Sequence, residues 1–85
     1  MKVIKKRELY ACSQGDFVGK TFVVINVEGQ TVNCLQLPEM KNIKISTESF
    51  DSGRKSDIIE LVEVLPKDVF EVTAAQYHKN EDSNN

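Results

Sequence analysis

The chain has 85 residues, which suffice for one small domain but not for two domains that each bury a core. Hydrophobic residues make up 40% and charged residues 28%, a composition that excludes collagen-like, membrane-spanning and wholly disordered classes. A net charge of -2, a single His and no Trp also speak against most metal sites, His-dependent active sites and strongly basic nucleic-acid binders.

The charge is unevenly distributed along the chain. Residues 1–44 carry seven Lys or Arg and four acidic residues, a balance of +3, whereas residues 45–85 carry four and nine, a balance of -5. Two halves of opposite sign attract each other when a fold interleaves them. If the fold instead gathers the basic positions on one side, that side is suited to phosphates or to an acidic protein surface.

The strongest local signal is a β-hairpin over residues 22–37. Two runs rich in β-branched residues, 22–27 and 30–37, flank Glu28 and Gly29, and this arrangement predicts a tight two-residue turn. The resulting register places five apolar side chains on a face that we expect to be the core: Val23, Ile25, Val27, Val32 and Cys34.

The opposite face of this hairpin would carry Phe22, Val24 and Leu35 among polar residues. Such a face is too apolar to stay open to solvent. We therefore expect it to be covered, either by the ends of the chain itself or by a partner.

Beyond the hairpin, alternation of Ile43 and Ile45 with polar residues predicts a strand over 41–47. Residues 48–56 have the composition of turns and are expected to form a surface loop anchored by Phe50.

The segment 57–65 fits two structures. A helical stripe of apolar residues and a capping box formed by Asp57 and Glu60 allow a helix. Its content of Ile and Val and the following Pro66 favour a strand instead. This interpretation leaves a single helical turn over 66–70 and a closing strand over 71–76. One domain would then span 1–77, with a disordered polar tail over 78–85.

The expected fold class is mainly β. Five short strands in a meandering order, an early loop over 14–19 and a one-turn helix before the last strand resemble a small SH3-like barrel over residues 8–77. Without Trp, the aromatic cluster with which SH3 domains bind proline-rich peptides is missing, which argues against such ligands. Bacterial barrels of this kind are similar to ribosome- and transcription-associated modules that bind RNA or protein, and to small endoribonuclease toxins.

Residue patterns give no support for metal, cofactor or catalytic chemistry. Cys12, Cys34 and His78 are too far apart in sequence for metal-ligand spacing, and His78 borders the expected tail, where no catalytic geometry would be held. Glu60 and Glu63 alternate with apolar residues, as on the solvent face of a strand. We expect no enzyme, no cofactor and two free thiols in a reducing cytoplasm. No apolar run is long enough for a membrane span or a signal peptide.

The function that remains is a non-catalytic protein-interaction module, such as a phage- or plasmid-encoded inhibitor or regulator of a host complex. Exposed loops and the second hairpin face supply the candidate partner contacts: Phe17, Val18, Lys20, Phe22, Val24, Leu35, Phe50, Arg54 and Lys55. A homodimer joined through Phe22, Val24 and Leu35 is a further possibility.

Two alternatives remain open. An RNA- or single-stranded-DNA-binding barrel would use a basic N-terminal strip formed by Lys5, Lys6, Arg7 and Tyr10, which combines charge with a ring for base stacking. An endoribonuclease toxin-like barrel would use Arg54 and Lys55, which lie beside serines in the loop before residue 57.

Overall fold

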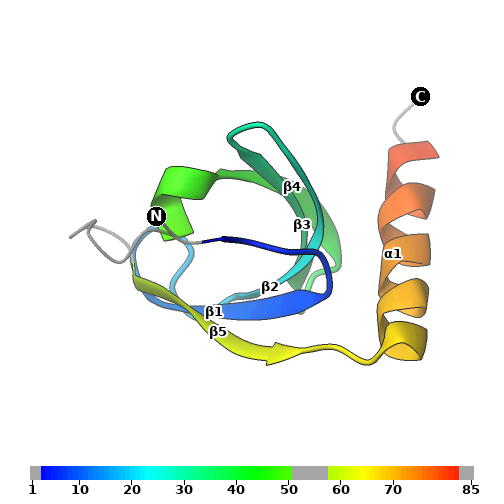
Figure 1. The fold of residues 1–85 in the computed structure, drawn as a ribbon, viewed down its shortest axis with the longest axis horizontal. Coiled ribbons are helices and arrows are strands. Elements are labelled where there is room, and N and C mark those ends of the chain that lie inside the picture. The colour runs from blue at the N-terminus through cyan, green and yellow to red at the C-terminus, as the bar shows by residue number, and fades with distance from the viewer. Residues whose placement is uncertain (1–2, 51–57, 83–85) are drawn as a thin grey trace.

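The computed structural model describes residues 3–50 and 58–82, which form five antiparallel strands, a 3-10 turn and a C-terminal helix (Figure 1). The strands form one sheet in the order β4-β3-β2-β1-β5, and this sheet curls round a barrel interior (Figure 1). The elements are β1 (Glu8–Gln14), β2 (Thr21–Glu28), β3 (Thr31–Leu37), β4 (Lys41–Ser46), η1 (Thr47–Phe50), β5 (Ile58–Val64) and α1 (Lys67–Asp82).

The expected fold class, a mainly β domain with five strands, is confirmed. The preference for a strand over a helix at 57–65 is also confirmed, because Ile58–Val64 forms β5. A 3-10 turn, η1, precedes the last strand, β5, although the helical turn was expected over 66–70 and the last strand over 71–76. The first strand, Glu8–Gln14, was not expected from the sequence.

The C-terminal segment differs from the expectation. The helix α1 has 16 residues, so the helical turn expected at 66–70 is only its beginning. The closing strand expected over 71–76 is wrong, because these residues are helical. Residues 78–82 also belong to the helix rather than to a disordered tail. The β-branched residues of this segment have moderate strand propensity, but propensity is weak against packing. Phe70, Ala74 and Tyr77 recur at helical spacing and all pack against the sheet.

Two apolar clusters lie on the two faces of the β2–β3 hairpin. The barrel interior holds Tyr10, Cys12, Phe22, Val24, Val32, Cys34, Ile45, Phe50 and Ile59. The outer face of the hairpin packs against the helix through Val23, Ile25, Leu35, Leu65 and Tyr77. The chain's own C-terminal helix therefore supplies the cover that the apolar composition of the hairpin requires.

The register of the hairpin corrects the predicted assignment of faces. The turn consists of Gly29 and Gln30, since Glu28 pairs with Thr31, and Gly29 has the positive φ of 61° that suits the first position of a tight hairpin turn. The pairing shifts between Val24 and Asn26. This bulge inserts one residue into β2 and exchanges the faces of the residues before it.

Because of that exchange, Phe22 and Val24 lie inside the barrel, whereas Val23 and Ile25 lie beneath α1. This is the reverse of the expected arrangement. Leu35 lies on the outer face, as expected.

Candidate interaction surface

Three side chains predicted to contact a partner through the hairpin are buried. Phe22, Val24 and Leu35 have exposed fractions of 0% each, the first two inside the barrel and the third beneath α1. Neither a partner protein nor a second copy of the chain can reach the hairpin through these side chains, which instead hold the two layers of the fold together.

The early loop offers less surface than its sequence suggested. The ring of Phe17 packs edge-on against Phe22 with 5.4 Å between ring centroids, and Lys20 forms an ion pair with Glu39 at the β3–β4 turn. Val18 at the apex is 58% exposed. Of the three loop residues predicted as contacts, Val18 is therefore the one that presents an apolar side chain to solvent.

The loop that follows β4 is described only in part. Phe50 ends η1 and is 1% exposed, with its ring 4.9 Å from that of Tyr10 between centroids. It is a core residue rather than a contact residue. Arg54 and Lys55, the residues predicted for both a partner and a ribonuclease site, lie outside the described residues.

Tyr10 belongs to the core and not to a base-stacking surface. It is 1% exposed, and its hydroxyl donates a hydrogen bond of 2.9 Å to Oε1 of Glu8. Burial raises the pKa of Tyr10, and the hydrogen bond and charge of Glu8 raise it further. The ring is therefore unavailable to a nucleobase.

The remaining members of the basic strip divide into two kinds. The Arg7 side chain is engaged within the fold, because its Nε donates to the carbonyl oxygen of Leu65 at 3.0 Å. The backbone of Leu65 returns a hydrogen bond of 2.8 Å to the carbonyl oxygen of Arg7, which fixes the junction between β5 and α1. Lys5 and Lys6 are exposed.

Both cysteines are free thiols inside the barrel. Burial raises the pKa of Cys34 from 9.0 to about 12, so its thiol stays protonated at neutral pH and is a poor nucleophile. Within residues 3–50 and 58–82, no three His, Cys, Asp or Glu side chains are placed to hold a metal ion together. The helices in the same ranges are too short or too polar to cross a membrane.

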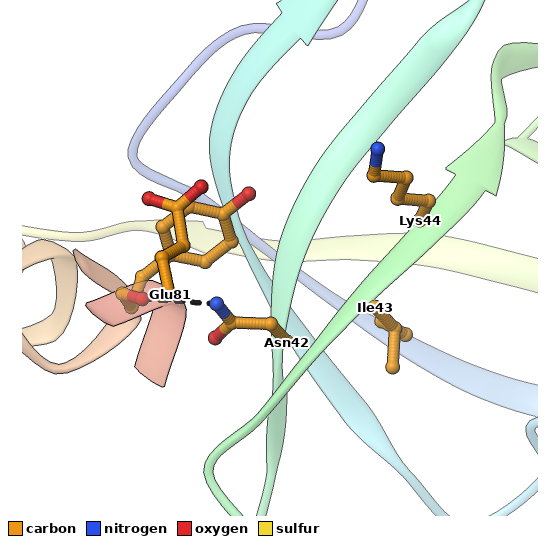
Figure 2. Close-up of a pocket in the computed structure, with 5 residues that line it drawn as sticks. Asn42, Ile43, Lys44 and Glu81 are labelled. Atoms are coloured by element: carbon orange, nitrogen blue, oxygen red, sulfur yellow. Dashed lines mark hydrogen bonds between the residues drawn. The ribbon is translucent and has the colours of Figure 1, made fainter. Parts of the chain in front are cut away.

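A hollow of about 270 Å³ lies where the C-terminal half of α1 meets β4 (Figure 2). It is lined by Asn42, Ile43, Lys44, Tyr77 and Glu81. Nδ2 of Asn42 donates to the carbonyl oxygen of Tyr77 at 2.9 Å, and Nδ2 of Asn80 donates to Oδ1 of Asn42 at 2.9 Å. The amides at this hollow thus fasten the helix to the sheet.

The largest group of exposed apolar side chains on a strand is on β5. Leu61 is 46% exposed, Val62 57% and Val64 55%. β5 pairs with β1 on one side and, within the described part of the chain, has no strand on its other side. Such an edge presents unpaired backbone N–H and C=O groups beside its apolar side chains.

The pairing of β5 with β1 assigns its side chains to two different faces. Leu61 lies opposite Tyr10 and shares its inner face, whereas Glu60 and Glu63 lie opposite Ala11 and Leu9 on the outer face. The register shifts between these pairs because Val62 is an extra residue in β5.

Sequence reasoning did not select β5 as a contact surface. Its alternation of acidic and apolar residues was interpreted as an ordinary solvent-facing strand, and its position at a sheet edge is not visible in the local pattern. The signal available was the number of apolar residues, since five of the seven in Ile58–Val64 are Ile, Leu or Val.

Comparison of the chain with known protein families, with curated proteins and with solved structures finds no match. The class of protein is therefore defined by the fold itself: a five-stranded barrel with a helix docked on its outer face and an apolar strand at one free edge. Its function has to be inferred from that surface.

Proposed function

We propose that this protein is a non-catalytic interaction module that binds another protein through the free edge of β5. The observation that carries this role is the exposure of Leu61, Val62 and Val64 on a strand that pairs with only one other strand among the described residues, although it also contacts η1. Extended segments add to such edges through backbone hydrogen bonds, and pockets for alternate side chains then give specificity. A module of this size suits a cytoplasmic regulator or inhibitor of a larger complex, encoded by a phage or a plasmid.

The energetics favour occupation of this edge. Full burial of a Val or Leu side chain contributes roughly 1.5–3 kcal/mol. Because Leu61, Val62 and Val64 are each about half exposed, covering them would contribute on the order of 2–4 kcal/mol before the costs of association. Soluble monomers usually blunt their edges with Lys, Pro or a covering segment. Here Glu60, Glu63 and the bulge at Val62 are the features that limit indiscriminate pairing.

Site-specific photo-cross-linking in the native host tests this role. A photoreactive amino acid is placed at Val62 on the edge or, as a control, at Val72 on α1, which is 73% exposed and lies on a different element. We expect position 62 to form a covalent adduct with another polypeptide that survives nuclease treatment, and position 72 to form none. Absence of an adduct at 62, or equal adducts at both positions, would contradict the proposed role.

The same experiment separates the nucleic-acid alternative. Lys5 and Lys6 remain exposed, but Arg7 and Tyr10 are engaged within the fold. If nuclease treatment abolished every adduct, and Lys5→Glu with Lys6→Glu removed a salt-sensitive association, nucleic acid would replace protein as the partner.

A further inference from the structure

We infer that the occupant of the β5 edge is an extended segment of another protein in which Lys or Arg alternates with apolar residues. The inference rests on the interaction role proposed above and adds the chemistry of the partner. It follows from how β5 distributes charge and apolar surface between its two faces.

The two acidic residues of β5 lie on one face despite their spacing of three in the sequence. Glu60 is opposite Ala11 and Glu63 is opposite Leu9, two positions apart on β1. In a regular strand, residues three apart lie on opposite faces. Because Val62 is an extra residue in β5, Glu60 and Glu63 lie on the same face instead. Their partners Ala11 and Leu9 are residues i and i+2 of β1 and so lie about 7 Å apart, which gives Glu60 and Glu63 a similar spacing along the outer face.

The inner face of the same strand is apolar. Ile59 is 5% exposed and belongs to the barrel interior, whereas Leu61 and Val64 continue along that face but remain about half exposed. A segment laid along β5 places successive side chains on alternate faces. Basic side chains at every second position would then lie opposite Glu60 and Glu63, and apolar side chains between them would cover Leu61 and Val64. Opposite charges in directly opposed pairs stabilise a sheet.

A second copy of the chain fits this edge less well. Antiparallel pairing of two β5 strands centred between Leu61 and Val62 places Glu60 of each copy opposite Glu63 of the other, and like charges in that position are unfavourable. The β4 edge of a second copy could also pair with β5, and it carries Lys41 and Lys44. Their register partners Gln36 and Asn33 lie on opposite faces of β3, however, so the two lysines do too. β4 therefore presents one lysine, not two, to the outer face.

Peptide binding to the full chain tests the inferred chemistry. The probe is a fluorescein-labelled nine-residue peptide in which Lys and Val alternate, and its control is a peptide of the same composition with all Lys before all Val. We expect fluorescence anisotropy to show at least tenfold tighter binding of the alternating peptide. We also expect Glu60→Lys with Glu63→Lys to weaken that binding at least tenfold and to favour an alternating Glu and Val peptide instead.

A matched variant controls for overall charge. Asp16→Lys with Glu71→Lys makes the same change of charge at exposed positions in the early loop and on α1. We expect this variant to bind the alternating peptide within twofold of the wild type. Circular dichroism of both double variants verifies that each retains the fold.

Three results would overturn the inferred occupant: no binding of the alternating peptide, equal binding of the two Lys and Val peptides, or equal weakening by the two double variants. If the cross-linked adduct at Val62 persisted in any of these cases, the interaction role would stand and only the basic partner would fall. Adducts formed solely between copies of the chain, with a dimer in sedimentation, would assign the edge to a second copy. Loss of both the adduct and peptide binding would refute both proposals.

Discussion

Replacing Tyr77 with alanine removes the largest buried side chain of the cluster that joins α1 to the sheet. Tyr77 is 6% exposed and packs in one cluster with Val23, Ile25 and Leu35 of the hairpin. Truncation of a buried aromatic residue to alanine costs about 3–5 kcal/mol, because apolar contacts are lost and a cavity remains. At ~0.05–0.15 kcal/mol per residue, that is roughly a quarter or more of the free energy of unfolding expected for a domain of this size.

Urea unfolding followed by far-ultraviolet circular dichroism measures this loss. With a slope of about 1.5 kcal/mol per M, the midpoint of Tyr77→Ala should fall by about 2–3 M. The control is Val72→Ala on the same helix, which is 73% exposed and should stay within about 0.5 kcal/mol of the wild type. A change below about 1 kcal/mol for Tyr77→Ala would refute the docking of α1 described here. Combination with Leu35→Ala should be non-additive by about 0.5–3 kcal/mol, since the two side chains share one cluster.

Three further predictions concern single residues. Asn80→Ala removes the amide that donates to Oδ1 of Asn42 and to the carbonyl oxygen of Met40. Urea unfolding should then show that the free energy of unfolding falls by about 1–2 kcal/mol. An unchanged midpoint would mean that these hydrogen bonds do not hold the helix against the sheet. Gly29→Ala places a Cβ at a φ of 61°, and the same assay should show a loss of about 1 kcal/mol unless the turn adopts another geometry. Because burial raises the pKa of Cys34 from 9.0 to about 12, its contribution to stability is complete below pH 9 and is lost as the pH rises from 9 toward 12. The difference in unfolding free energy between the wild type and Cys34→Ala should shrink over that range, and a constant difference would contradict a raised pKa.

The elements that the sequence predicts are those with strong local patterns. The β2–β3 hairpin has two β-branched runs around a glycine turn, and β4 has clean alternation, so each is visible without tertiary information. β1 lacks such a run, and its strand structure depends on pairing with β2 and β5 on either side. The helix α1 was missed for a related reason, because its β-branched residues favour a strand until packing against the sheet selects a helix.

The candidate contact surface was harder to predict than the fold. Whether Phe22 and Val24 face the barrel interior or the helix α1 depends on a single bulged residue, and no local pattern marks that bulge. Leu35 is hidden by a helix more than 30 residues away in the chain. The exposure of β5 depends on the strand order, which places this strand at the edge of the sheet. The pattern of residues along the chain predicts the period of a strand or helix, but it does not show which segment covers which face of the sheet.

The hairpin of β2 and β3 is covered on one face by the barrel interior and on the other by α1, whereas β5 contacts the sheet through β1 alone. Amides of the hairpin should therefore exchange with solvent only on global unfolding, and those at the outer edge of β5 by local opening. This separation also bears on how the protein evolves. Under the proposed interaction role, sequence drift at Leu61 and Val62 would alter what the edge recognises while leaving the buried hairpin intact.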